Sequence, residues 1–146
     1  MITKMRRGFL ATTALLAIPA FAPAKTASQA ERVRYRVVFQ VSDVDPQKWN
    51  LTLNNVQNLM DDLDKAAVFA EIVVYGPGIG MLKGDSAVGN RVADALKGGI
   101  QVVACENTMQ GQKLARSDML PGIGYVKSGV VELVKKQREG FAYIRP

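Results

Sequence analysis

The feature of this sequence that most constrains its fold is a regular alternation of short apolar segments with helical patterns. Short runs of β-branched and aromatic side chains are typical of buried strands. Such runs occur at residues 34–41, 68–75, 100–104, 124–126 and 141–144. Because continuous apolar strands are buried on both faces, the alternation predicts a three-layer α/β fold. We expect a mostly parallel five-stranded sheet with helices on both faces.

Helical patterns fill the intervals between these runs. After the first run, Asp45 supplies an N-cap and Pro46 occupies the first helical position, where a missing N–H has no cost. Apolar side chains then recur at helical spacing, and they are Trp49, Leu53, Val56, Met60 and Leu63. Because Trp49 shares this stripe, we expect it to pack in the core rather than to serve as a stacking surface. Further helices are expected after caps at Asp85 or Ser86, at Asn107 or Thr108, and at Ser128.

Residues 1–24 are typical of a cleaved export signal. A basic start without acidic residues precedes an apolar stretch at residues 9–18, and small residues up to Ala24 form a cleavage site. The stretch is shorter than the roughly 20 residues that span a bilayer, so we expect no stable membrane span after cleavage. The sequence therefore predicts a periplasmic protein with a short linker at residues 25–32 and one α/β domain at residues 33–146.

The start of the chain also indicates an export route. The segment Arg6-Arg7-Gly8-Phe9-Leu10 resembles the twin-arginine export motif, although Met5 stands where that motif prefers Ser or Thr. General secretion is the alternative route. Cleavage at Ala30, an uncleaved membrane anchor and a disordered tail in a cytoplasmic protein are the alternatives to cleavage near Ala24.

Half of the net charge of +6 belongs to the export signal. Removing residues 1–24 takes away three of the 19 basic residues and none of the 13 acidic ones, which leaves a net charge of +3. The basic run at residues 135–138 falls in the last turn of an expected helix, where cations suit the helix dipole. We therefore predict no nucleic-acid partner.

The absence of histidine excludes several classes of enzyme. Ser/His/Asp triads, Cys–His dyads and the usual zinc enzymes all need an imidazole. The single cysteine, Cys105, cannot close a disulfide within the chain or supply an iron–sulfur site alone. The aspartates do not recur at a spacing typical of a metal site, so we predict no metal and no cofactor. Any nucleophilic chemistry here is expected to be thiolate chemistry.

Cys105 ends the third apolar run, just before an expected helix. Ligands of open α/β sheets bind beyond the carboxyl ends of the strands, so Cys105 lies at the expected ligand edge. Unpaired N–H groups and the helix dipole favour an anion there, which lowers the pKa of a thiol. Glu106 opposes this effect, whereas Lys83 or Lys113 would assist it. The alternative is a small, buried and inert side chain.

The glycine-rich segment at residues 76–80 follows the second run. It lacks the order of a dinucleotide or Walker loop, because no helix follows it directly and Lys83 is not followed by Ser or Thr. A tight turn is one interpretation. The other is a lid in which the N–H groups of Gly76, Gly78 and Gly80 face the same pocket as Cys105.

Several segments resemble the DsrE/DsrF-like family, and in particular an exported branch of it. They are Val-Val-Tyr-Gly-Pro-Gly-Ile at residues 73–79, Val-Val-Ala-Cys-Glu-Asn-Thr-Met at residues 102–109 and Gly-Phe-Ala-Tyr-Ile-Arg-Pro at residues 140–146. The resemblance covers about residues 33 to 146. It implies a small α/β domain that forms homo- or hetero-oligomers, and relatives that carry a persulfide on a cysteine at the position of Cys105.

Two hypotheses for function follow. In the first, the protein is a periplasmic sulfur carrier with sulfurtransferase-like chemistry, which takes sulfur from a donor or passes it to an acceptor protein. Cys105 attacks as a thiolate, and N–H groups of Asn107, Thr108 and the 76–80 loop stabilise the anion, aided by Lys83. In the second, the protein is a non-catalytic module for small-ligand binding or oligomeric assembly, and Cys105 is structural.

Overall fold

The computed structural model describes residues 35–146, so the expected export signal at residues 1–24 and the linker at residues 25–32 lie outside the described residues. The strands are β1 (Tyr35–Val41), β2 (Val68–Val74), β3 (Gln101–Cys105), β4 (Gly124–Val126) and β5 (Ala142–Ile144). The helices between them are α2 (Pro46–Asp62), α3 (Gly89–Lys97), α4 (Glu106–Gly111) and α5 (Gly129–Arg138). Short 3₁₀ helices cover Lys65–Ala67, Gly76–Leu82 and Arg116–Asp118.

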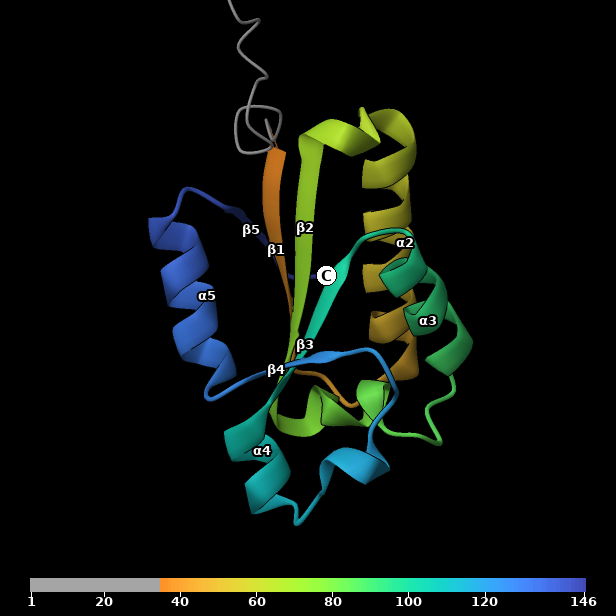
Figure 1. Ribbon diagram of the computed structural model, residues 1–146, viewed down its shortest axis with the longest axis vertical. Helices are drawn as coiled ribbons and strands as arrows, with labels where there is room; N and C mark the ends of the chain where they lie inside the picture. Colours follow the sequence, from red (N-terminus) through yellow and green to blue (C-terminus); the bar gives the residue numbers. More distant parts are fainter. Residues whose placement is uncertain (1–34) are drawn as a thin grey trace, which may run out of the picture.

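The strands form one sheet in the order β4-β3-β2-β1-β5, and each pair of neighbours is parallel (Figure 1). The expected α/β fold with a five-stranded parallel sheet is therefore confirmed. Both β1 and β2 are central strands, and their buried residues alternate between the two faces of the sheet. Because the strands are parallel, their carboxyl ends lie at one edge of the sheet, which for β1, β2 and β3 is the lower edge in Figure 1.

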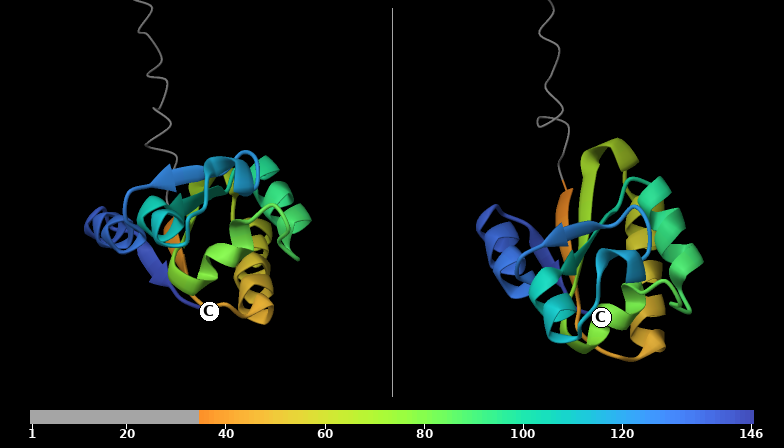
Figure 2. Two further views of the ribbon diagram at one scale, coloured as in Figure 1. Left: turned by 90° about the horizontal axis from the view of Figure 1, so that it is seen from below. Right: turned by 60° about the horizontal axis from the view of Figure 1, so that its bottom comes forward.

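The two faces of the sheet are covered unequally, as the views in Figures 1 and 2 show. Helices α2 and α3 cover one face, where the larger apolar core includes Phe39, Ile72 and Val102. Helix α5 covers the other face, where Leu133 packs in a smaller buried cluster with Val38, Val73 and Val103. The layers are thus helix, sheet and helix, with the main core on the α2 side.

Helix α2 forms as its sequence predicts. The Asp45 carboxylate accepts a hydrogen bond of 2.8 Å from the N–H of Gln47, and Pro46 begins the helix. The expected stripe is buried at Trp49, Leu53, Val56 and Met60. Leu63 caps the helix and is only half-buried. Trp49 lies in the core as expected, and its indole N–H donates a 2.7 Å hydrogen bond to the carbonyl of Asp43.

Two expected helix starts are wrong. Helix α4 is capped by Cys105 rather than by Asn107 or Thr108, because the Thr108 hydroxyl accepts a 2.9 Å hydrogen bond from the N–H of Gly76 instead. Helix α3 begins at Gly89, and the Ser86 hydroxyl accepts from the N–H of Val88 ahead of it. The tight turn considered for residues 76–80 is a 3₁₀ helix that extends to Leu82.

A buried ion pair joins α5 to the sheet. Glu71 in β2 is 2% exposed, and one of its carboxylate oxygens lies 2.7 Å from the ammonium nitrogen of Lys136. That ammonium group also faces the rings of Phe69 and Phe141, which pack edge to face. Burial raises the pKa of Glu71 against the opposing effect of Lys136. Burial alone would lower the pKa of Lys136, but Glu71 and the other nearby carboxylates outweigh it, and the pKa is raised.

No helix within residues 35–146 is both long enough and apolar enough to cross a membrane.

Replacing Lys136 with methionine is expected to destabilise the fold by about 3–5 kcal/mol at neutral pH, because it leaves the buried Glu71 carboxylate without a cation. Since burial raises the pKa of Glu71, folding favours its protonated form. The loss should therefore shrink as the pH falls through that raised pKa. Urea unfolding of wild type and variant across the acidic range measures both effects. The matched control is Lys136→Met with Glu71→Leu, which should recover most of the stability, and a loss independent of pH would contradict the prediction.

Candidate functional site

The parallel sheet brings several polar side chains to one edge and one face. Val38, Val73 and Val103 lie against α5, so the residues two positions further along each strand direction face the same side. These residues are Gln40 in β1, Tyr75 just after β2, and Cys105 at the end of β3. Tyr143 pairs in register with Val38, so Tyr143 and Arg145 extend this face across β5. The start of α5 lies beside this row.

Cys105 occupies the junction of β3 with α4 and lies beside the start of α5. It is 5% exposed and serves as the N-cap of α4. Its thiol donates a 3.9 Å hydrogen bond to the carbonyl of Lys127, which also accepts a 3.2 Å hydrogen bond from the N–H of Asn107. The Lys127 carbonyl thus holds the turn before α5 against the first residues of α4.

Hydrogen-bond donors from both helices favour the thiolate form of Cys105. Burial by itself raises the pKa of the thiol. The hydroxyl and N–H of Thr108, the N–H of Gly129 and the N–H of Asn107 outweigh burial, and the pKa of Cys105 is lowered. Gly129 is the first residue of α5, so the thiol receives donors from the starts of two helices. Together these groups shift the thiol toward its anionic form.

Thr108 links Cys105 to the glycine-rich segment. Its hydroxyl accepts from the N–H of Gly76 at 2.9 Å and is among the groups that lower the pKa of Cys105. Gly76 has a φ of +56°, a left-handed conformation that favours glycine, and its carbonyl accepts a 3.4 Å hydrogen bond from the Gln112 side chain. The structure therefore brings together Cys105, Asn107, Thr108 and Gly76 from the expected set of site residues.

The remaining members of that set contact other parts of the chain. A side chain at Gly78 would meet the Val41 carbonyl at 2.8 Å, so this glycine allows two backbone segments to approach closely. A side chain at Gly80 would meet the ring of Trp49 at 3.2 Å. The ammonium group of Lys83 lies 3.7 Å from Asp85. These contacts place Gly78, Gly80 and Lys83 outside the group of residues described around Cys105.

Sequence reasoning missed the polar residues next to Cys105. Tyr75 is half-buried, and burial is the main reason that its pKa is raised. The charges of Tyr143 and Cys105 raise it further, and that of Arg145 lowers it. Its side chain also packs against Gly129, where an added Cβ would lie 2.9 Å from Tyr75. The only sequence signal for Tyr75 and Arg145 was that each directly follows a strand and so lies at the expected ligand edge.

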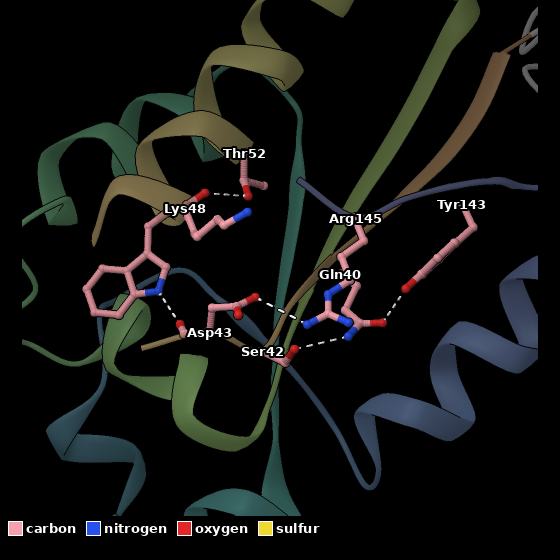
Figure 3. A network of polar contacts seen from close by, with 8 residues as sticks. Gln40, Ser42, Asp43, Lys48, Thr52, Tyr143 and Arg145 are labelled. Atoms are coloured by element: carbon pink, nitrogen blue, oxygen red, sulfur yellow. Dashed lines mark hydrogen bonds and ion pairs between the residues drawn. The ribbon is translucent and has the colours of Figure 1, made fainter. Parts of the chain in front are cut away.

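A second group of polar contacts continues this row on β1 and β5 (Figure 3). The hydroxyl of Tyr143 donates to the Gln40 side-chain oxygen, and the Gln40 amide nitrogen donates to the Ser42 hydroxyl at 3.0 Å. The Arg145 guanidinium lies 3.6 Å from the Asp43 carboxylate. The sequence places Ser42 and Asp43 at the expected ligand edge, because they follow the first strand, but it does not indicate Gln40 or Tyr143.

A hollow away from Cys105, of about 240 Å³, lies between α2 and α3 near the amino ends of β2 and β3. Its lining includes Met60, Arg91 and Ile100. Arg91 there donates to the side-chain oxygens of Asn50 and Asn54, which fastens α3 to α2. Residues 35–146 hold no cluster of three or more acidic, cysteine or histidine side chains able to bind a metal ion.

The fold and the site define a class: a small α/β protein with a buried cysteine at the carboxyl edge of its parallel sheet. No family model and no curated protein matches the chain. Among solved structures, the chain is 39% identical to MTH1491 of Methanobacterium thermoautotrophicum, a protein of unknown function, with a TM-score of 0.73. The match covers 77% of this chain and 99% of MTH1491. The chain belongs to the same family as MTH1491.

Two more distant structures share the fold. The conserved protein of unknown function BT1422 from Bacteroides thetaiotaomicron is 15% identical with a TM-score of 0.63, and the match covers 82% of this chain and 99% of BT1422. The ychN protein from E. coli is 10% identical with a TM-score of 0.60, and the match covers 77% of this chain and 99% of ychN. These likenesses show the fold alone.

Replacing Thr108 with valine is expected to slow alkylation of Cys105 at neutral pH by about tenfold or more, since a hydrogen bond to a charged group contributes about 1.5–3 kcal/mol. The loss of a donor raises the thiol pKa, so the rate should reach its plateau at a higher pH than in the wild type. The rate of iodoacetamide labelling as a function of pH measures this shift. Thr108→Ser keeps the hydroxyl and should behave as the wild type, whereas equal profiles for wild type and Thr108→Val would refute the role of the hydroxyl.

Proposed function

We propose that this protein is an exported, DsrE/DsrF-like sulfur carrier that holds a persulfide on Cys105. The observation that supports this proposal is the position of Cys105 at the carboxyl end of β3, at the start of α4 and beside the turn that leads into α5, where groups of Asn107, Thr108 and Gly129 lower the pKa of its thiol. Such donors stabilise a thiolate before reaction and a terminal persulfide anion after it. The sequence segments around Cys105 that resemble the family lead to the same proposal.

The chemistry needs no redox partner. The Cys105 thiolate attacks the terminal sulfane sulfur of a donor, a new sulfur–sulfur bond forms, and the donor's own sulfur–sulfur bond breaks with its electron pair leaving on the released anion. Cys105 then carries a persulfide, from which an acceptor thiolate takes the outer sulfur and regenerates the Cys105 thiolate. Because the pKa of Tyr75 is raised, its phenol stays protonated at neutral pH and acts as a donor rather than as a base. A carrier, unlike a hydrolase, needs no general base here.

The burial of Cys105 favours a second candidate function, a non-catalytic binding or assembly module. In that case Cys105 is a packing residue, and a thiol reagent should label it slowly in the folded protein and rapidly after unfolding.

Measuring the intact mass of the protein after reaction distinguishes the two candidate functions. The protein is incubated with polysulfide or with thiosulfate, freed of excess reagent and weighed intact. The sulfur-carrier function predicts an adduct of one sulfur atom, reversed by a reducing thiol, on most of the wild-type protein and absent from Cys105→Ser. An unmodified wild type, or an equal adduct on Cys105→Ser, rules the carrier function out.

We also propose that the protein acts in the periplasm as a homo-oligomer, with a sulfur donor or acceptor protein as a further partner. The signal-like composition of residues 1–24 supports export. Three valines on the outer face of α5, at 130, 131 and 134, support self-assembly because they are between 48% and 55% exposed. Leu133 is the large apolar side chain of this helix that packs against the sheet.

Replacing Val130 and Val134 with lysine is expected to weaken self-association by at least about tenfold, because two charges would enter an apolar contact. Sedimentation of wild type and variant over a range of concentrations measures the change. Val44→Lys serves as the matched control, because Val44 is another exposed valine and lies between β1 and α2 rather than on α5. It should leave the oligomer intact. An unchanged sedimentation profile for the double variant would exclude α5 as the contact.

A further inference from the structure

The polar row at the carboxyl edge ends in a guanidinium that the fold leaves accessible. The Arg145 side chain is 52% exposed, and its charged partner within residues 35–146 is Asp43, at 3.6 Å. Other arginines are held by closer contacts: Arg91 donates to Asn54 at 2.7 Å, and Arg116 pairs with Glu106 at 2.7 Å. An ion pair between partly exposed groups contributes only about 0–1 kcal/mol, so an incoming anion competes readily with Asp43.

The neighbours of Arg145 are held in place by hydrogen bonds. Both ends of the Gln40 amide are engaged, the oxygen by the Tyr143 hydroxyl and the nitrogen by Ser42. Figure 3 shows these groups side by side at the end of β1, with Arg145 next to Asp43. Because Phe39 pairs in register with Ile144, Arg145 lies beside Gln40 at the same level of the sheet. The guanidinium thus extends from an ordered edge of the sheet.

The row connects Arg145 with Cys105 through Tyr75. The pairing of Val41 with Val74, and of Val74 with Ala104, places the residues that follow these strands next to one another across the edge. Tyr75 lies between β1 and β3 in this row, and the charges of both Arg145 and Cys105 act on its phenol. Tyr75 therefore lies next to Cys105 on one side, and on the other side the end of β1 lies between Tyr75 and Arg145.

We propose that Arg145, with the Tyr75 hydroxyl, binds the oxyanion end of a small sulfane-sulfur donor while the outer sulfur of that donor meets Cys105. This inference rests on the proposed sulfur-carrier function and names its substrate class, of which thiosulfate is the simplest member. A guanidinium presents a planar fork of N–H donors that matches an oxyanion, and the protonated phenol adds another donor.

The step balances without another reactant. The Cys105 thiolate attacks the outer sulfur of thiosulfate, the Cys105–sulfur bond forms, and the sulfur–sulfur bond of thiosulfate breaks. The bonding electron pair leaves on sulfite, and Cys105 retains a persulfide anion. Arg145 faces the sulfonate group throughout, so it binds the donor and then the departing sulfite. A polysulfide has no oxygen atoms for the Arg145 guanidinium to bind. Transfer of sulfur from a polysulfide to Cys105 should therefore not depend on Arg145.

The test compares two donors on three proteins: wild type, Arg145→Gln and Arg138→Gln. Arg138 ends α5 at the far edge of the sheet, so its variant controls for the loss of one positive charge. We expect Arg145→Gln to raise the thiosulfate concentration that half-saturates persulfide formation by about tenfold or more, the loss expected for a charge-assisted hydrogen bond. Loading from polysulfide should stay within about twofold of wild type in both variants.

The outcomes separate this inference from the proposed function. If wild type loads no sulfur from either donor, the sulfur-carrier function fails and the inference with it. If wild type loads from thiosulfate and Arg145→Gln loads with the same half-saturation, the function stands and the role of Arg145 is refuted. An equal loss with both donors would also refute it, because Arg145 would then act on Cys105 rather than on the oxyanion.

Binding without reaction gives a second readout. Calorimetry with thiosulfate on Cys105→Ser should detect binding that is lost when Arg145→Gln is added. It should strengthen when Asp43→Asn is added instead, because the competing carboxylate is then removed. Binding unaffected by either second substitution would place the anion elsewhere and overturn the proposal.

Discussion

Parallel pairing of the strands is the constraint on which the rest of this structure depends. Hydrogen bonds between parallel strands align their directions, so all carboxyl ends meet at one edge. The register then places Tyr75 and Cys105 beside each other, although thirty positions of sequence separate them. Arg145 reaches the same edge because β5 runs parallel to β1, and it lies on the β1 side of Tyr75 because β5 pairs with β1. The site is therefore a product of strand order.

The environment of Cys105 combines two opposing effects. Burial of Cys105 disfavours a charged sulfur, whereas donor groups at the starts of α4 and α5 favour it, and the pKa of the thiol is lowered. The Glu71–Lys136 pair holds α5 against the same face of the sheet. A contact far from the sulfur thus helps to keep the N–H of Gly129 in place beside it.

Local patterns in the sequence predicted much of the fold. The strands, the stripe from Trp49 to Met60 and the place of Cys105 at a strand end all follow from neighbouring residues, because side-chain periodicity depends on short-range geometry. The helix caps at Asn107 or Thr108 were wrong because the Thr108 hydroxyl binds Gly76, a residue from another part of the chain. Glu71 was missed because a charged residue in an apolar strand gains its partner only from a distant helix.

By itself, the sequence determined the class of fold, the exclusion of imidazole chemistry and the one cysteine able to act as a nucleophile. Only the tertiary structure decided which groups surround that cysteine. Gly129, Tyr75 and Arg145 come to its edge through strand order and register, which arise from contacts between distant segments. The pKa of Cys105 likewise depends on the balance between burial and donors from two helices. That balance cannot be read from the order of residues along the chain, because it depends on how the helices pack.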